Sequence, residues 1–322
     1  MLTIVVPAYN EALVLTEFQH RLATVLDALD EDCRVLYVDD GSTDDTWARV
    51  GSLADADGRV GGLRLSRNFG KEAALSAGLD HVGDDADAVV VIDADLQDPP
   101  EFIPALVAKW REGFDVVYAV RNTRDGESMT KKFTSAAFYR VMERVSDTAI
   151  PRDTGDFRLL SRRALAALRK MPERQRFMKG LFTWIGFRQT GLGYHREPRH
   201  AGRSKWNYPR LMNLAIEGIT SFSTVPLRLA TLAGVIASLL AFGFGVWVLV
   251  KALVWGDAVR GYPTIMIVML FLGGMQLLAL GVIGEYLGRT YIESKQRPRY
   301  FVDDMRRPHG TGGKIDHTSA SG

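Results

Sequence analysis

Two long runs of uncharged, mostly apolar residues constrain this chain more than any other feature of its sequence. They extend from Leu229 to Val250 and from Thr264 to Gly284. Each run reaches the ~20 residues that a helix needs to cross the hydrocarbon core of a membrane. A buried helical hairpin in a soluble protein is the alternative, but it does not require two uncharged runs of this length. We therefore expect membrane-spanning helices at residues 228–254 and 263–287.

Basic residues flank both runs, whereas the short link from Lys251 to Pro263 carries few charges. Because basic flanks stay on the cytoplasmic side, we expect a multi-pass protein of the inner (cytoplasmic) membrane with both termini in the cytoplasm. Residues 288–322 are expected to form a cytoplasmic basic segment and a disordered tail. The flanking basic residues are Arg199, Arg203, Lys205, Arg210 and Arg228 before the first run, and Arg289, Lys295, Arg297, Arg299, Arg306 and Arg307 after the second.

The first third of the chain alternates apolar, strand-like runs with segments of helical spacing. Strands are predicted at 2–7, 34–38, 60–65, 88–92 and 115–120, and helices at 11–29, 44–54, 71–81 and 100–111. Single helices between strands predict an α/β fold, with a mostly parallel sheet and helices on both faces. Neither a dinucleotide-binding fingerprint nor a P-loop occurs. The 40 basic and 38 acidic residues nearly balance, so the overall charge says little about partners. We expect no nucleic-acid partner.

The fourth predicted strand ends in carboxylates, within the sequence DAVVVIDADLQDPPE. Alternate side chains of an extended segment point the same way, so Asp93, Asp95 and Gln97 can gather their oxygens on one side. Such a sparse set of oxygens suits Mg²⁺ or Mn²⁺, which keep part of their shell for water and substrate phosphates. A solvated acidic turn that caps the next helix is the alternative. Polar residues also follow the other strands, at the edge where α/β sheets bind ligands, and this convergence favours a ligand site.

Five motifs follow one another in this region: PAYNE at 7–11, VDDGSTDDT at 38–46, SRNFGKEAAL at 66–75, DADLQDPPE at 93–101 and GDFRLLSR at 155–162. With the two apolar runs, they resemble the inverting family-2 glycosyltransferases of the GT-A fold. The match covers nearly the whole chain and is closest to the polyprenyl-phosphate and dolichyl-phosphate hexose synthases, especially bacterial bactoprenol glucosyltransferases. It implies a GT-A domain at 1–200, a Rossmann-like fold, and a G-x-S-K loop with a juxtamembrane, interfacial helix at 201–227.

The resemblance implies transfer of one sugar from a nucleotide sugar, with UDP-glucose favoured, to a polyprenyl (undecaprenyl) phosphate. It assigns donor binding to Pro7, Tyr9, Glu11, Asp39, Asp40, Lys71 and Ala94. It assigns the Mg²⁺ or Mn²⁺ site to Asp93, Asp95 and Gln97. It assigns the acceptor phosphate to Arg121, Lys132, Ser135 and Ser204, with Lys131 as an alternative to Lys132. The catalytic set that it implies is Asp93, Asp95, Asp156, Arg203 and Lys205.

The role of Asp156 stays open at this point. In related enzymes that glycosylate hydroxyl groups, the matching position holds the general base. A lipid monophosphate with a second pKa of about 6 is already largely ionised at pH 7, so no strong base is needed. We expect Asp156 to orient the acceptor or a neighbouring arginine. The alternative is that Asp156 caps a helix predicted from Leu159 to Leu168.

Two other functions are compatible with parts of the sequence. A processive polysaccharide synthase would need more spans and a Q-x-x-R-W motif, which this chain lacks. A non-catalytic, membrane-anchored sugar-binding protein would not need the intact Asp93, Asp95 and Lys71. The segments Met129 to Val145 and 177–187 suit either a membrane interface or a protein core. The resemblance favours a homo-oligomer, with a tetramer as one candidate, and leaves the sugar, the nucleotide and the choice of ion open.

Overall fold

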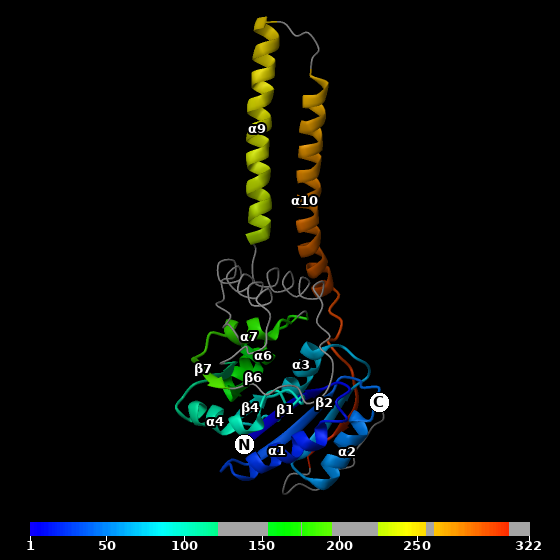
Figure 1. The fold of residues 1–322 in the computed structure, drawn as a ribbon, viewed down its shortest axis with the longest axis vertical. Coiled ribbons are helices and arrows are strands. Elements are labelled where there is room, and N and C mark those ends of the chain that lie inside the picture. Colours follow the sequence, from blue (N-terminus) through cyan, green and yellow to red (C-terminus); the bar gives the residue numbers. More distant parts are fainter. Residues whose placement is uncertain (122–153, 175, 195–224, 256–260, 309–322) are drawn as a thin grey trace. The chain divides into compact units, whose positions relative to one another are not determined.

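The computed structural model describes residues 1–121, 154–174, 176–194, 225–255 and 261–308 (Figure 1). The segment Met129 to Val145 and the predicted juxtamembrane helix up to residue 224 lie outside these residues. The described chain falls into two compact units. The sheet unit holds the residues up to Tyr194 together with those from Arg297 onward, and the two-helix unit holds residues 225–255 and 261–296. The domain boundaries given above stay predictions.

Strands and helices alternate along the sheet unit as expected for its first half. The elements are β1 (Leu2–Ala8), α1 (Leu15–Asp27), β2 (Cys33–Asp39), α2 (Thr46–Ala56), β3 (Val60–Leu65), α3 (Lys71–His81), β4 (Ala88–Val91), η1 (Pro100–Phe102), α4 (Ile103–Arg111), β5 (Val116–Arg121), β6 (Thr154–Ser161), α6 (Arg162–Arg169), α7 (Met178–Trp184), β7 (Gln189–Tyr194) and β8 (Val302–Arg306). The two-helix unit contains α9 (Val225–Trp255) and α10 (Tyr262–Ser294).

The strands of the described residues form one sheet in the order β7-β5-β6-β4-β1-β2-β3-β8. The neighbours β4, β1, β2 and β3 are parallel to one another, and β5 is parallel to β7. The strands β6 and β8 run antiparallel to their neighbours. The predicted α/β fold with a mostly parallel sheet is confirmed. The fifth predicted strand does not extend the parallel series, because β6 lies between β4 and β5.

Helices cover both faces of this sheet, so its central strands are buried throughout (Figure 1). On one face, Ile4 of β1 belongs to a core cluster with Phe18 of α1 and Ile103 of α4. On the other face α3 packs closely, because a Cβ on Gly78 would lie only 2.4 Å from a methyl group of Val5. Burial on both faces explains why these strands are apolar at every position rather than at alternate ones.

Residues 154–161 correct one expectation from the sequence. They form strand β6, and α6 begins at Arg162, where the Ser161 Oγ accepts a hydrogen bond from the Ala164 N–H at 3.3 Å. Asp156 therefore lies inside a strand, and its interpretation as a helix cap is wrong. Leu159 pairs with Val90 of β4 and with Val117 of β5, so two ladders of backbone hydrogen bonds outweigh the helical spacing of the local sequence.

The segment 177–187 packs on the protein core rather than standing free. Its helix α7 buries Met178, Leu181 and Phe182. Trp184, at the end of the helix, is 61% exposed. The aromatic residues of this segment thus serve mainly to attach α7 to the sheet.

The helices α9 and α10 lie side by side (Figure 1). By length and composition alone, their segments Val225–Trp247 and Phe271–Ser294 are long and apolar enough to cross a membrane. Their large apolar side chains are exposed, as in Leu239 (66%) and Leu277 (72%). An apolar surface of this size in a helix pair needs a partner other than water.

Candidate active site

The loops that follow β1, β2, β3 and β4 meet at one cleft of about 290 Å³. This is the edge of the sheet at which the sequence predicted ligand binding. The described residues that line the cleft are Pro7, Ala8, Tyr9, Glu11, Asp40, Asn68, Gly70, Lys71, Ala74, Asp93, Ala94 and Asp95. The cleft thus brings together all the predicted donor-binding residues except Asp39, and both predicted metal-binding aspartates.

The first wall of the cleft is a turn after β1 that is tied to the loop after β2. Asn10 has a φ of 56°, a left-handed conformation that asparagine tolerates better than most residues. Its backbone N–H donates to the Ser42 Oγ at 2.9 Å, and its side-chain oxygen accepts from the Thr43 N–H at 2.9 Å. These bonds fix the positions of Tyr9 and Glu11 on either side of Asn10.

Asp39 and Asp40 end β2 and differ in what they contact. Asp40 accepts hydrogen bonds from the N–H groups of Phe69 and Gly70, at 2.8 and 3.0 Å, and so holds the loop of residues 66–70 that joins β3 to α3. Asp39 is fully buried and accepts from the Ser42 N–H at 3.0 Å. Burial raises the pKa of both carboxyl groups, and these hydrogen bonds partly oppose the rise. We call residues 66–70 the β3–α3 loop.

Lys71 forms salt bridges with Asp93 and Asp156, two residues of the predicted catalytic set. Its Nζ atom lies 2.7 Å from Asp93 Oδ2, after β4, and 2.6 Å from Asp156 Oδ2, in β6. Burial alone would lower the pKa of Lys71, but the two carboxylates outweigh burial and raise it. The sequence separates Asp156 from Asp93 widely, and the sheet order that places β6 beside β4 brings them together.

Asp156 is held ionised by its surroundings. Burial would raise its pKa, but the positive charges of Lys71, Lys179 and Arg158 lower it well below the usual range for aspartate. Its Oδ1 atom is buried without a hydrogen bond to any residue that the structure describes. A carboxylate with a lowered pKa is a weak proton acceptor, so this environment does not suit a general base.

Sequence reasoning missed Glu72 and Arg158, which surround these ion pairs. Glu72 accepts a hydrogen bond from the Met178 N–H at 3.3 Å, and burial, with the nearby Asp156 charge, raises the pKa of Glu72 to about 7. Arg158 is 3% exposed, with its guanidinium 3.9 Å from the centroid of the Phe182 ring, and burial lowers its pKa to about 10. A charged residue within an apolar strand indicates a buried charge. This signal was not visible at Arg158, because the sequence predicted a helix directly after it and no strand around it.

Sequence reasoning also missed Lys179, on α7. Burial lowers the pKa of its ammonium group, and the positive charges of Lys71, Arg121 and Arg158 outweigh the opposing charge of Asp156. Within the described part of the chain, Lys179 forms no salt bridge with a carboxylate. A half-buried cation in this state favours an anionic ligand.

Arg121, predicted to contact the acceptor phosphate, ends β5 beside the same cluster. A Cβ on Gly155 would lie 3.0 Å from an Nη atom of Arg121, which places the guanidinium against the residue before Asp156. Its Nε atom is buried and has no hydrogen-bond partner among the described residues. Nearby, the Tyr194 hydroxyl donates to a carboxylate oxygen of Asp98, and the pKa of Tyr194 is raised by burial and by that charge.

The predicted metal ligands lie on a tight turn after β4. Leu96 is buried with a φ of 58°, a strained conformation for a residue of its size. The turn lets Asp95 Oδ1 accept from the Gln97 N–H at 3.1 Å. Asp93 and Asp95 line the cleft, whereas Gln97 is buried and does not. No group of three or more histidine, cysteine or acidic residues able to hold a metal ion occurs in the described ranges.

The remaining predicted residues lie outside the described residues. They are Lys131, Lys132, Ser135, Arg203, Ser204 and Lys205. Their assignments to the acceptor phosphate and to the G-x-S-K loop stay predictions.

The α/β sheet carries its cleft of acidic and basic side chains at the carboxyl ends of the parallel strands, and comparison with known proteins gives the family. Residues 3–169 match the model of glycosyl transferase family 2, and residues 225–290 match the GtrB C-terminal hairpin. The chain therefore belongs to glycosyl transferase family 2.

Similar proteins match over nearly their whole length. A glycosyltransferase from Synechocystis sp., described as uncharacterized, is 49% identical over 94% of this chain and 95% of its own. A prophage bactoprenol glucosyl transferase homolog from Escherichia coli is 42% identical, and a bactoprenol glucosyl transferase from Shigella phage SfV is 43% identical. Both of these cover 95% of this chain and 99% of their own. The family predicted from the five motifs is confirmed.

Proposed function

We propose that this protein transfers one sugar, with inversion, from a nucleotide sugar to a polyprenyl phosphate at the cytoplasmic face of the inner membrane. UDP-glucose is the favoured donor and undecaprenyl phosphate the favoured acceptor. The observation that carries the proposal is the cleft in which Lys71 bridges Asp93 and Asp156, beside Arg121. The bactoprenol glucosyl transferases at 42–43% identity support the acceptor and the sugar.

A divalent cation fits the residues of the cleft. Asp93 and Asp95 both line it, and carboxylate oxygens are the ligands that Mg²⁺ and Mn²⁺ prefer. Asp93 Oδ2 contacts Lys71, so we propose Asp93 Oδ1 and the Asp95 carboxylate as ligands. Gln97, on the same turn, is the third proposed ligand. When bound, such an ion would offset the negative charge that develops on the departing nucleoside diphosphate.

The protein's own cations can stabilise the same charge. Lys71 and Lys179 reach the cluster from α3 and α7. Lys71 is held ionised by Asp93 and Asp156, whereas burial and neighbouring cations around Lys179 favour an added anion. Breaking a bond between sugar and phosphate leaves charge on the phosphate, so cations that are already in place lower the barrier without further rearrangement. We propose that Arg203 and Lys205 of the G-x-S-K segment complete this set.

Asp156 acts in this proposal by orientation and not by proton transfer. The acceptor phosphate is already an anion near neutral pH, so it needs positive charge around it more than it needs a base. The salt bridge of Asp156 to Lys71 holds that ammonium in the cleft, at 2.6 Å. Arg121, Lys132, Ser135 and Ser204 are the proposed contacts of the acceptor phosphate.

The two apolar helices support an acceptor that resides in a membrane. A polyprenyl chain stays in the bilayer while its phosphate stays at the surface, so an enzyme that uses it benefits from a membrane anchor. The basic flanks of both helices support the assignment of the sheet unit and both termini to the cytoplasmic side. We also propose a homo-oligomer, with a tetramer as the form to test by light scattering in detergent.

The proposal is tested with the purified full chain, radiolabelled nucleotide sugars and undecaprenyl phosphate. We expect label in an organic-extractable, acid-labile lipid, with UDP-glucose giving the highest rate, and loss of that label in chelator. Polymeric product would instead indicate a processive synthase. No transfer from any donor would indicate a non-catalytic sugar-binding protein, and full activity in chelator would refute the metal site.

A further inference from the structure

The β3–α3 loop forms one wall of the cleft, through Asn68 and Gly70, and leads directly into Lys71. Two contacts fix its inner side. Asp40 accepts hydrogen bonds from the Phe69 and Gly70 N–H groups, and a Cβ on Gly41 would lie 2.4 Å from the loop backbone. The loop thus packs directly against the end of β2, which leaves no space between them.

The outer side of the loop is contacted by residues that follow α10 in the chain. The Phe301 carbonyl accepts a hydrogen bond from the Ser66 N–H at 3.0 Å. The Phe301 ring lies 6.3 Å from the Phe69 ring, centroid to centroid, at an interplanar angle of 52°. Within the loop, the guanidinium of Arg67 lies 4.1 Å from the centroid of the Phe69 ring. Phe69 therefore contacts both a cation of its own loop and an aromatic ring from outside it.

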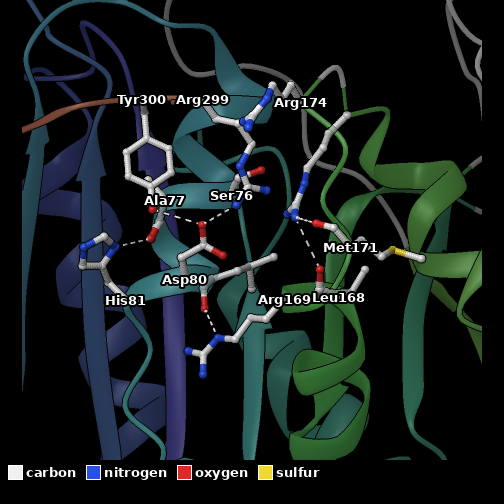
Figure 2. Close-up of polar contacts among 12 residues, drawn as sticks. Ser76, Ala77, Asp80, His81, Leu168, Arg169, Met171, Arg174, Arg299 and Tyr300 are labelled. Atoms are coloured by element: carbon white, nitrogen blue, oxygen red, sulfur yellow. Dashed lines mark hydrogen bonds and ion pairs between the residues drawn. The ribbon is translucent and has the colours of Figure 1, made fainter. Parts of the chain in front are cut away.

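The residues before Phe301 are anchored on the last turn of α3. Figure 2 shows Arg299 and Tyr300 directed toward Asp80, whose Oδ2 atom is 2.9 Å from the Arg299 guanidinium and 3.0 Å from the Tyr300 hydroxyl. The Tyr300 ring also lies 6.0 Å from the His81 ring. We call residues 297–301 the return segment. It contacts the end of α3 at Asp80 and the loop before α3 at Phe69.

Two further contacts fix the ends of the return segment. Arg174 donates a hydrogen bond to the carbonyl of Arg297 at 2.9 Å. At the other end the chain continues into β8, which pairs with β3 directly before the β3–α3 loop. The last turn of α3 is itself held, since the Arg169 Nε donates to the Leu79 carbonyl at 2.9 Å. The return segment therefore rests on a fixed surface and can support the loop.

We propose that the return segment supports the donor site from outside the cleft, with Phe301 as a positioning residue that holds the β3–α3 loop, and through it Asn68 and Lys71, against the nucleotide sugar. Phe301 touches the loop and not the cleft, so it acts through Phe69. This inference rests on the proposed function for the identity of the ligand. The class of ligand concerned is a nucleoside diphosphate, with or without its sugar.

The test compares Phe301→Ala with a matched control, Met305→Ala, in the full chain. Met305 follows Phe301 closely, is 36% exposed and pairs with Leu63 of β3, away from the loop. For Phe301→Ala we expect the KM for the nucleotide sugar to rise about three- to tenfold, the loss expected for one aromatic pair, with kcat nearly unchanged. Phe301→Tyr should restore the wild-type KM, and Met305→Ala should not change it.

Two readouts do not depend on sugar transfer. Calorimetry with UDP should show weaker binding to Phe301→Ala by the same factor, and hydrogen exchange should become faster at the Phe69 and Gly70 amides but not in β1. An unchanged KM and unchanged exchange in Phe301→Ala would overturn the proposal, as would an equal effect of Met305→Ala. If Phe301→Ala does not fold, Tyr300→Phe removes only the hydroxyl contact with Asp80 and is expected to give the same change in smaller measure.

These readouts also separate this inference from the proposed function. If the wild-type protein transfers no sugar to polyprenyl phosphate, but UDP binding and loop exchange still respond to Phe301→Ala, the proposed function fails and the return segment keeps its role. If transfer occurs and Phe301→Ala behaves as wild type in all three readouts, the inference fails and the proposed function stands.

Discussion

Strand β4 and helix α9 are both apolar runs, but their side chains lie in opposite surroundings. In β4 every residue is buried, between helices on the two faces of the sheet. In α9 the large side chains point outward, and Leu240 is 66% exposed within the part of the chain that the structure describes. The same residue chemistry therefore builds a protein core in one unit and an exposed apolar surface, which we propose faces lipid, in the other. An apolar run indicates that its side chains avoid water. Its length and secondary structure indicate whether protein or lipid surrounds them.

The strongest test of this comparison places the same charge in each run. Val90→Asp in β4 leaves an unpaired carboxylate in a fully buried position and should destabilise the sheet unit by about 3–5 kcal/mol. Leu240→Asp in α9 should cost about 2.5–3.5 kcal/mol of membrane insertion and leave the sheet unit folded. UDP calorimetry and membrane fractionation measure the two effects. Loss of UDP binding in Leu240→Asp, to the extent seen in Val90→Asp, would contradict the distinction.

A second pair of variants sharpens the comparison inside the sheet unit. Asp93→Asn should lower the rate of sugar transfer at least about a hundredfold, because it removes a proposed ligand of the divalent cation. Asp156→Asn should lower it by about tenfold or less, since Asp156 acts by holding Lys71 rather than by accepting a proton. Initial rates with radiolabelled donor give both numbers, and membrane retention should not change. Equal and complete loss in both variants would show that Asp156 has a direct chemical role.

The sheet unit is also expected to respond to pH through Glu72. Its pKa in the folded protein is raised from 4.5 to about 7, so the folded state binds more protons than the unfolded state between these values. The stability that comes from the neutral form is fully present below pH 4.5 and is lost as the pH rises through 7. Glu72→Gln keeps the carbonyl that accepts from Met178 and should be more stable than wild type by about 3 kcal/mol at pH 8.

Thermal unfolding of wild type and Glu72→Gln, at pH 5 and pH 8, measures this difference. The melting temperatures should nearly agree at pH 5 and separate at pH 8. A constant difference at both values would mean that Glu72 does not titrate in this range.

The smallest effect is expected from a glycine pair, one in each unit. Gly78→Ala in α3 should cost about 1–3 kcal/mol by overpacking against Val5 and Val38, partly offset by about 1 kcal/mol of helix propensity. At Gly281 in α10 a Cβ would meet nothing within 4 Å, so Gly281→Ala should be neutral or slightly stabilising. Melting curves in detergent compare the two. A marked loss at Gly281 would indicate that another copy of the chain packs there.

The sequence predicts the first half of the sheet well because its signals are local. The helix from Lys71 to His81 was expected at its observed bounds, and the strands β1 to β4 lie within a residue or two of the predicted ranges. The convergence of Tyr9, Asp40 and Asp93 follows from parallel topology alone. Such features depend on neighbours in the chain and on one rule about crossovers.

The sequence fails where distant segments decide the structure. Residues 159–161 have helical spacing with the segment after them, and only pairing with β4 and β5 makes them a strand. The contact of Lys71 with Asp156 depends on that same pairing. Strand β8 pairs with β3, and Phe301 contacts Phe69, although these segments lie far apart in the sequence. No local sequence pattern predicts either contact.

The position of β8 in the chain has a consequence for how the protein is made. Translation reaches Val302 only after α9 and α10 have both been synthesised, whereas β3 leaves the ribosome near the beginning. Until then the backbone groups along the outer side of β3 lack their antiparallel partner, and an unpaired strand of this kind readily pairs with other chains. Nascent chains that stall before Val302 should therefore be the species most prone to aggregate. Under the proposed membrane location, insertion of the helices would precede completion of the sheet.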